Sequence, residues 1–353
     1  MMTNRLNQIE VKHIGRTHFY QDVLWLILSG SGVEFSYTGK ELALTICGRE
    51  AALNAEVPEN YPRVAVYVND ERVVDTLVDC EKKECVILHS TEEQTVDVKI
   101  IKLSECAMSM CGIRQITSDT SQFCAGKERA YRMEFIGDSI TCGYGVDDED
   151  CEHHFSTATE DVTKAFAYKT AMALDADYSM FSTSGHGIIS GYTDDLDVKH
   201  TDQRIPDRYT TLGLCFDTFD GTLQTTDVAW DFERFQPDLI VINLGTNDDS
   251  YCQDMEERQM EYKDAYKQFL HLVRSRNAKA HIVCVLGLMG NRLYPFVCKA
   301  CQEYAQETGD QRISTFELPE QDGNVGYVAD YHPMECFHQK ASDALVAYIK
   351  TLL

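Results

Sequence analysis

Hydrophobic and polar positions follow two different rhythms along the chain, and the change falls near residue 125. Before it, short apolar runs rich in Val and Ile partly alternate with polar residues, as in "RVAVYVNDERVVDTLV" (63–78), and turn residues such as Asn69-Asp70 separate them. Alternation with a period of two is typical of strands with one buried face. The first third is therefore predicted to be an antiparallel β-sandwich of the jelly-roll kind.

After residue 125, apolar strands alternate with helical patterns. The clearest strand, "PDLIVINLG" (237–245), is continuously apolar, which is typical of a strand buried on both faces of a parallel sheet. Further strands are predicted at 132–136, 178–181, 280–288 and 313–316, and helices at 162–174, 257–276, 292–308 and from 337 onward. This alternation predicts a right-handed α/β domain with a parallel sheet over residues 126–353, after a β-sandwich domain over 1–125.

The charge of the chain excludes several kinds of partner. Lys and Arg number 32 and Asp and Glu 57, so the formal net charge is −25. Such a surface repels nucleic acid and anionic membranes, whereas a neutral substrate such as a sugar fits it. Neither a membrane helix of ~18–20 apolar residues nor the apolar core of a signal peptide is visible. We therefore expect a cytoplasmic protein, or a secreted one if a leader was removed.

The fourteen cysteines are scattered along the chain. Their even number leaves a disulfide framework open. Several lie in apolar segments such as "HIVCVLG", where a reduced cysteine acts as a small hydrophobic residue. Cys298 and Cys301 form a lone C-x-x-C without the second pair that a zinc site needs. We therefore favour reduced, packed thiols.

Side chains capable of chemistry follow the ends of predicted strands, which is where ligands bind in open α/β sheets. Ser139 ends "EFIGDS"; it is either a turn residue or a nucleophile with a base within hydrogen-bond reach. Asn247 follows "INLGT", and its amide can donate to a developing oxyanion. His332 lies beside Asp330 in "ADYHP", and a histidine held by an acid is the general-base half of an acyl-transfer site.

Two loops carry further candidates. "STSGHGI" places Gly185 and Gly187 just past a predicted strand, where a glycine lets a backbone N–H approach a substrate oxygen. The loop "VDDEDCEHHFSTATEDV" (146–162) brings acidic residues together with His153 and His154. Because this loop lacks fixed ligand spacing, we interpret it as a solvated acidic loop in preference to a metal site.

The order G-D-S, glycine loop, G-x-N-D and D-x-H-P resembles the SGNH (GDSL-type) hydrolase superfamily over about residues 130–353. "EFIGDSITCGYG", "PDLIVINLGTND" and "ADYHP", preceded by a β-rich segment with "IGRT" and "GVEFSYTG", resemble carbohydrate esterase family 2 more specifically. Members of that family join a jelly-roll domain to an SGNH domain and remove acetyl groups from plant polysaccharides such as xylan. The resemblance implies a jelly roll over 1–125 and a three-layer α/β/α SGNH hydrolase domain over 126–353.

The resemblance also implies a role for each candidate residue. Ser139 would be the nucleophile and His332 its base, with either Asp330 or a backbone carbonyl orienting the imidazole. The oxyanion hole would consist of the Ser139 N–H, the Asn247 amide and the N–H of Gly187, with Gly185 as the alternative to Gly187. Tyr331 stands where family 2 enzymes often carry tryptophan, so its ring is expected either to bind a sugar or to pack.

The function implied is that of a carbohydrate O-deacetylase, similar to acetyl xylan esterases, acting on acetylated carbohydrate without a metal or an organic cofactor. Two alternatives stay open. One is a GDSL-type lipase or thioesterase acting on other short acyl esters. The other is a catalytically inactive protein that binds carbohydrate.

Overall fold

A computed structural model describes residues 1–353, and the chain divides into two compact units. Unit 1 comprises Met1–Glu128, Ser156–Glu160 and Thr211–Trp230, and unit 2 comprises Arg129–Phe155, Asp161–Thr210 and Asp231–Leu353. The first division lies close to the boundary drawn from the sequence. Two later segments also belong to the N-terminal unit, which a single boundary does not describe.

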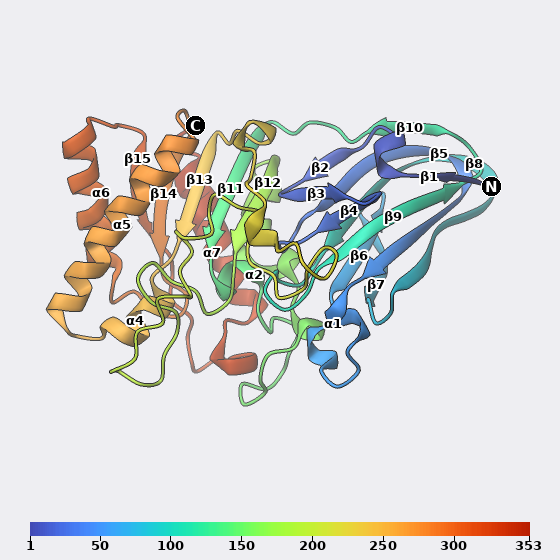
Figure 1. The fold of residues 1–353 in the computed structure, drawn as a ribbon. Coiled ribbons are helices and arrows are strands. Elements are labelled where there is room, and N and C mark those ends of the chain that lie inside the picture. The colour runs from blue at the N-terminus through green and yellow to red at the C-terminus, as the bar shows by residue number, and fades with distance from the viewer. The chain divides into compact units, whose positions relative to one another are not determined.

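Unit 1 is an antiparallel sheet of ten strands in the order β3-β4-β9-β5-β8-β6-β7, with β1 paired to β9 and with β2 and β10 paired to β5. The strands, coloured blue to green in Figure 1, are β1 (Met2–Asn4), β2 (Lys12–Ile14), β3 (Thr17–Tyr20), β4 (Val23–Leu26), β5 (Gly32–Gly48), β6 (Arg63–Val68), β7 (Glu71–Leu77), β8 (Lys82–Lys102), β9 (Cys111–Ser118) and β10 (Gln122–Ala125). The helical turns of the unit are η1 (Leu6–Gln8), α1 (Glu50–Leu53), η2 (Pro58–Asn60), η3 (Thr157–Thr159) and η5 (Thr225–Asp227).

Two long strands dominate unit 1, although the sequence analysis predicted short ones. β5 has 17 residues and β8 has 21, and their pairing shifts register between Gly39 and Glu41 and again between Leu42 and Ala43. Such bulges bend a strand and increase its twist without ending it. Buried residues from both halves of β5, among them Phe35 and Leu44, therefore belong to one core cluster.

The turn expected at Asn69-Asp70 is present between β6 and β7. Both residues have left-handed backbones, with φ of 50° and 66°, the combination that suits a two-residue hairpin turn.

Unit 2 is built on a five-stranded parallel sheet in the order β12-β11-β13-β14-β15. Its strands are β11 (Tyr131–Gly137), β12 (Ala176–Ser182), β13 (Leu239–Asn243), β14 (His281–Leu286) and β15 (Ile313–Glu317), and its helices are α2 (Ser139–Cys142), α3 (Phe166–Ala173), α4 (Thr246–Cys252), α5 (Glu256–Arg276), α6 (Tyr294–Thr308) and α7 (Glu335–Ile349), with short turns η4 (Val162–Lys164), η6 (Phe232–Arg234) and η7 (Ala329–Tyr331). α5 packs on α6 and α3 on α7, and Figure 1 shows the α5–α6 pair and α7 on opposite sides of the sheet. The predicted fold class is confirmed.

The helices of unit 2 differ from expectation in three places. The helix expected at 162–174 is interrupted at Ala165, whose backbone is extended (ψ 151°), so η4 and α3 are separate. The short helices α2 and α4 begin directly after β11 and β13, where the sequence was interpreted as loop. They place Ser139 and Asn247 in first helical turns.

None of the helices combines the length and the apolar character needed to cross a membrane. The fourteen cysteines are free thiols, and most of them are buried, so the interpretation as packed, reduced residues agrees with the structure.

Candidate active site

Ser139 lies at the carboxyl end of β11, on the first turn of α2. Asp138 caps this helix, since its side chain accepts a hydrogen bond from the N–H of Ile140 at 3.1 Å. A Cβ on Gly137 would lie 2.0 Å from Thr141 Oγ1, so only glycine permits so tight a turn. The local sequence therefore holds the serine hydroxyl rigidly at a strand tip.

His332 is brought to this serine from a position 193 residues further along the chain, with its Nε2 2.8 Å from Ser139 Oγ. Its Nδ1 faces two backbone carbonyls, of Ala329 at 3.1 Å and of Asp330 at 3.2 Å. A protonated Nδ1 donates to these carbonyls, which leaves Nε2 with the lone pair that accepts the serine proton.

Burial lowers the pKa of His332 to about 4, and the hydrogen bonds to the Ala329 and Asp330 carbonyls only partly oppose this effect. A histidine with so low a pKa is neutral at pH 7. The imidazole beside Ser139 is therefore in the state that a general base requires.

The Asp330 carboxylate points away from the histidine. It accepts hydrogen bonds from the Tyr144 hydroxyl at 2.5 Å and from His154 Nδ1 at 2.9 Å. Either the Asp330 carboxylate or a backbone carbonyl was expected to orient His332. The structure shows contacts from backbone carbonyls, and Asp330 takes part through its carbonyl group and not through its carboxylate. The D-x-H spacing does not reveal this, because it places the two residues together without fixing the side-chain directions.

Asn247 lies on the first turn of α4, one strand away from Ser139. Its amide donates to the carbonyl of His186 at 2.9 Å and makes a longer contact of 3.4 Å with Asp138 Oδ2. Burial together with the charge of Asp248 raises the pKa of Asp138 to about 7. A buried amide thus lies beside the turn that carries Asp138 and Ser139.

Asp248 is a buried residue whose role the sequence left unassigned. Its carboxylate accepts the N–H groups of three consecutive residues, Ile188, Ile189 and Ser190, at 2.7 to 3.2 Å. Burial raises its pKa to about 6 against the effect of these hydrogen bonds. The aspartate after Asn247 thus fixes the glycine loop; an acidic residue directly after a buried strand is the signal that could have indicated it.

The two glycines of that loop are placed differently. The Gly187 N–H donates to the Gln203 carbonyl at 3.1 Å, and a Cβ there would lie 2.5 Å from an Asp248 oxygen. Gly185 has a left-handed φ of 74°, and a Cβ on it would meet open space. The Gly187 N–H is therefore engaged in the loop itself, whereas Gly185 borders open space.

The acidic loop is tied to the histidine-bearing segment, which the interpretation as a solvated loop did not foresee. His153 pairs with Asp148 at 2.9 Å, and its carbonyl accepts the Asp330 N–H at 2.9 Å. The Tyr331 hydroxyl contacts Glu152. Tyr331 is 51% exposed and directly precedes His332 in the chain.

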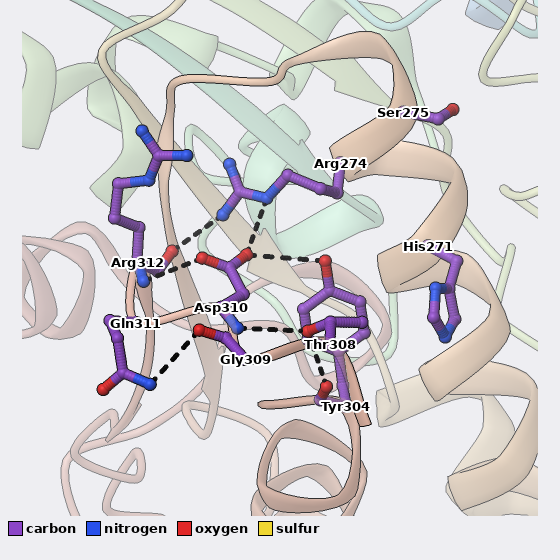
Figure 2. A pocket seen from close by; sticks show the side chains of 9 residues that line it. All are labelled: His271, Arg274, Ser275, Tyr304, Thr308, Gly309, Asp310, Gln311 and Arg312. Atoms are coloured by element: carbon purple, nitrogen blue, oxygen red, sulfur yellow. Dashed lines mark hydrogen bonds and ion pairs between the residues drawn. The ribbon is translucent and has the colours of Figure 1, made fainter. Parts of the chain in front are cut away.

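A polar depression lies at the opposite, amino-terminal edge of the same sheet (Figure 2). Arg274 donates there to Asp310 at 2.8 Å and to the carbonyls of Asn277, Ala280 and Arg312. These partners end α5 and precede β14 and β15. The arrangement ties chain ends together, and the serine that lines it, Ser275, bonds to the Leu272 carbonyl and not to a histidine.

A serine hydroxyl bonded to a neutral histidine, at the carboxyl ends of a parallel α/β sheet, defines the serine hydrolase class of site. The model of the GDSL-like Lipase/Acylhydrolase family matches residues 135–340. The chain belongs to this family.

Two relatives illustrate the similarity. The cellulase/esterase CelE of Acetivibrio thermocellus is 30% identical over 334 residues, which are 92% of this chain and 37% of CelE. An acetylxylan esterase / glucomannan deacetylase of Cellvibrio japonicus is 25% identical over 287 residues, 80% of this chain and 72% of that protein. This chain therefore spans little more than a third of CelE.

Solved structures extend the similarity to both units. A family two carbohydrate esterase from Clostridium thermocellum, in complex with cellohexaose, has a TM-score of 0.81 and 26% identity and covers 97% of this chain and 98% of its own. The acetyl xylan esterase Est2A from Butyrivibrio proteoclasticus has a TM-score of 0.89 at 23% identity, covers 99% and 98%, and shares the fold. The resemblance to SGNH hydrolases and to carbohydrate esterase family 2 is confirmed.

Proposed function

We propose that this chain is a carbohydrate O-deacetylase, similar to acetyl xylan esterases, which hydrolyses acetyl esters through a serine acyl-enzyme. The 2.8 Å contact between Ser139 Oγ and His332 Nε2 is the observation that carries the proposal. The relatives named above are esterases or deacetylases, which supports the class of substrate.

In the first step, His332 Nε2 takes the proton of Ser139 while Oγ attacks the acetyl carbonyl carbon. The imidazolium that forms keeps its Nδ1–H on the Ala329 and Asp330 carbonyls. The tetrahedral intermediate then collapses, and His332 gives its proton to the departing sugar oxygen. A water molecule, deprotonated by the same nitrogen, then attacks the acetyl carbon; the bond to Ser139 Oγ breaks, His332 returns the proton to Oγ and acetate leaves.

The oxyanion of the intermediate needs donors aimed at it. We assign this role to the Ser139 N–H, to the Asn247 amide and to the N–H of Gly185. Ser139 begins α2, and the first N–H groups of a helix have no partner within it. Gly185 replaces Gly187 in this assignment because the Gly187 N–H is bonded to Gln203. The substrate oxygen would take the place of the long Asn247 contact to Asp138.

Exposed aromatic rings supply a surface for the sugar. Tyr331 and Tyr192 are 51% and 54% exposed, and the Tyr331 ring meets the Tyr327 ring edge-on at 5.6 Å. The hydrogen bond to Asp194 and burial raise the pKa of Tyr192 most, and the charge of Asp330 adds to this effect, so the Tyr192 side chain lies near the segment that carries Asp330. Sugar rings stack on exposed aromatic faces, and a net charge of −25 suits a neutral glycan.

Acetate release from a panel of acetylated xylose, mannose and glucose oligosaccharides tests the proposal. We expect release from at least one of them, and expect acetyl esters to be hydrolysed faster than octanoyl esters of the same alcohol. Preference for the octanoyl ester would favour the lipase alternative. Glycan binding without turnover of 4-nitrophenyl acetate would favour an inactive binding protein.

A further inference from the structure

The imidazole of His332 is restrained by a side chain as well as by carbonyls. The Tyr144 ring stacks on it, with ring centroids 4.0 Å apart and an angle of 20° between the planes. The Nδ1 contacts fix the imidazole within its own plane, whereas the tyrosine covers one of its faces. Together they leave little freedom of rotation at Nε2.

Tyr144 is in turn held by Asp330. Its hydroxyl donates to one carboxylate oxygen at 2.5 Å, while His154 bonds to the other at 2.9 Å. Burial opposes the charge of Asp330, but the hydrogen bonds from Tyr144 and His154 outweigh it and lower the pKa of the carboxyl group. Asp330 is therefore an anion that anchors the tyrosine hydroxyl.

The backbone at this point adopts conformations that require such an anchor. Asp330 and Tyr331 have φ values of 48° and 60°, so two consecutive residues other than glycine are left-handed immediately before His332. Conformations of this kind persist only when the surrounding contacts determine them. The Gly145 backbone packs here, because a Cβ on it would lie 2.8 Å from the Cβ of Ala329.

We propose that Tyr144 and Asp330 are positioning residues for the general base: the Asp330 carboxylate fixes Tyr144, and the Tyr144 ring holds the His332 imidazole in line with Ser139. The proposal rests on the proposed function, and it gives Asp330 a role different from that of a triad acid. The side chain of His154 is 92% exposed, and because exposed ion pairs are weak, its bond to Asp330 contributes little to this arrangement.

Kinetics of single and double variants test this assignment. Tyr144→Phe keeps the ring and removes the hydroxyl, Asp330→Asn removes the charge, and Tyr144→Leu removes the ring. We expect kcat to fall about tenfold for each of the first two and about a hundredfold for the third, with KM within about twofold, because small misplacements of a base are costly. The double variant Tyr144→Phe/Asp330→Asn should match a single one, since both remove the same bond.

Tyr348 provides the matched control. Its ring stacks on Phe316 at 4.7 Å and 18°, in the same unit but away from Ser139. Tyr348→Leu should lower the melting temperature without lowering kcat. Circular dichroism at the assay temperature shows whether each variant is folded.

Another buried histidine, His338, lies close enough to His332 for their charges to interact. Burial, and to a smaller extent the charge of His332, lowers the pKa of His338 to about 3. Removing the Asp330 charge takes away a weak influence that raises the pKa of His332. Asp330→Asn should therefore not move the acid limb of the pH profile upward. If Tyr144 and Asp330 only stabilised the fold, their variants would leave the kcat of the folded fraction unchanged.

Labelling of Ser139 by diisopropyl fluorophosphate separates this proposal from the choice of substrate. Ser139 Oγ attacks phosphorus, fluoride leaves and His332 takes the proton, so the rate reports the positioned pair even if no acetyl ester is turned over. The labelling rates of the variants should fall in the same order as their kcat values. Wild-type rates in Tyr144→Phe and Asp330→Asn would overturn the proposal, and a loss of about 10⁴-fold in Asp330→Asn alone would make Asp330 the triad acid.

Discussion

The two edges of the parallel sheet in unit 2 carry polar networks of opposite character. At the amino-terminal edge, Arg274 donates to Asp310 and to the Arg312 carbonyl, as Figure 2 shows. It also donates to the carbonyls of Asn277 and Ala280, so all its partners belong to the scaffold. At the carboxyl-terminal edge, the Ser139 hydroxyl meets His332 Nε2, and both side chains are at most 9% exposed.

The two networks differ in the side chain at their centre and in what that side chain can do. At the amino-terminal edge, a permanently charged guanidinium meets acceptors that are part of the scaffold, so the arginine at its centre does not exchange a proton. At the carboxyl-terminal edge, a scaffold of carbonyls ends on an imidazole that can gain or lose one. A polar cluster thus indicates chemistry only where it ends on a nucleophile and a neutral base.

The largest expected effect is the loss of activity when the Ser139 hydroxyl is removed, compared with removal of a serine at the amino-terminal edge. Ser139→Ala is expected to lower kcat for 4-nitrophenyl acetate by at least about 10⁴-fold, because no other group can form the acyl-enzyme. Ser275→Ala, at the amino-terminal edge, is the control, since Ser275 Oγ only bonds to the Leu272 carbonyl. Equal activity of the two variants would remove the distinction between the edges.

The amide of Asn247 should have the next largest effect. Asn247→Ala is expected to lower kcat about a hundredfold with little change in KM, as loss of one oxyanion donor does. Asn291→Ala serves as control, because Asn291 bonds to the exposed Glu317. A change confined to KM would show that Asn247 binds the ground state instead.

At the amino-terminal edge we expect the opposite result, a loss of stability without a loss of activity. Arg274→Ala should lower the free energy of unfolding by about 2–3 kcal/mol, because a largely buried Asp310 loses its partner. Activity at 25 °C should stay unchanged. Arg292→Ala, which removes a more exposed arginine, should cost less than about 1 kcal/mol in a denaturant titration.

The pH profile offers the smallest and most specific effect. The pKa of His332 is lowered to about 4, so its proton leaves at lower pH than usual and the base form persists to about pH 5. The fall in kcat/KM for a neutral ester that comes from protonation of His332 should therefore have its midpoint near pH 4. Full activity at pH 3 would contradict the role of this imidazole as the base.

The sequence predicted the larger features because they depend on periodicity. Continuous apolar character placed the strand "PDLIVINLG", and strand ends placed Ser139, Asn247 and His332. Continuity of strands is harder to predict: residues 39–41 and 90–94 look like turns, but bulges carry β5 and β8 through them. Local composition does not reveal that two segments pair across such a bulge.

The details of the site depended on side-chain directions that spacing does not fix. Asp330 lies two residues before His332, yet its left-handed backbone turns the carboxylate toward Tyr144. Likewise the Gly187 N–H is used by Gln203, which only the fold reveals. The acidic loop was interpreted from its composition, which did not indicate that His154 reaches Asp330 across 176 residues of sequence.

The acyl-enzyme itself is the most direct test of the central claim. The protein is mixed with an acetylated oligosaccharide, quenched in acid within one turnover and digested, and the peptide carrying Ser139 is analysed by mass spectrometry. We expect one added acetyl group on Ser139, which disappears as acetate is released and never forms in His332→Ala. Acetate release with Ser139 unmodified at every time point would contradict the serine mechanism.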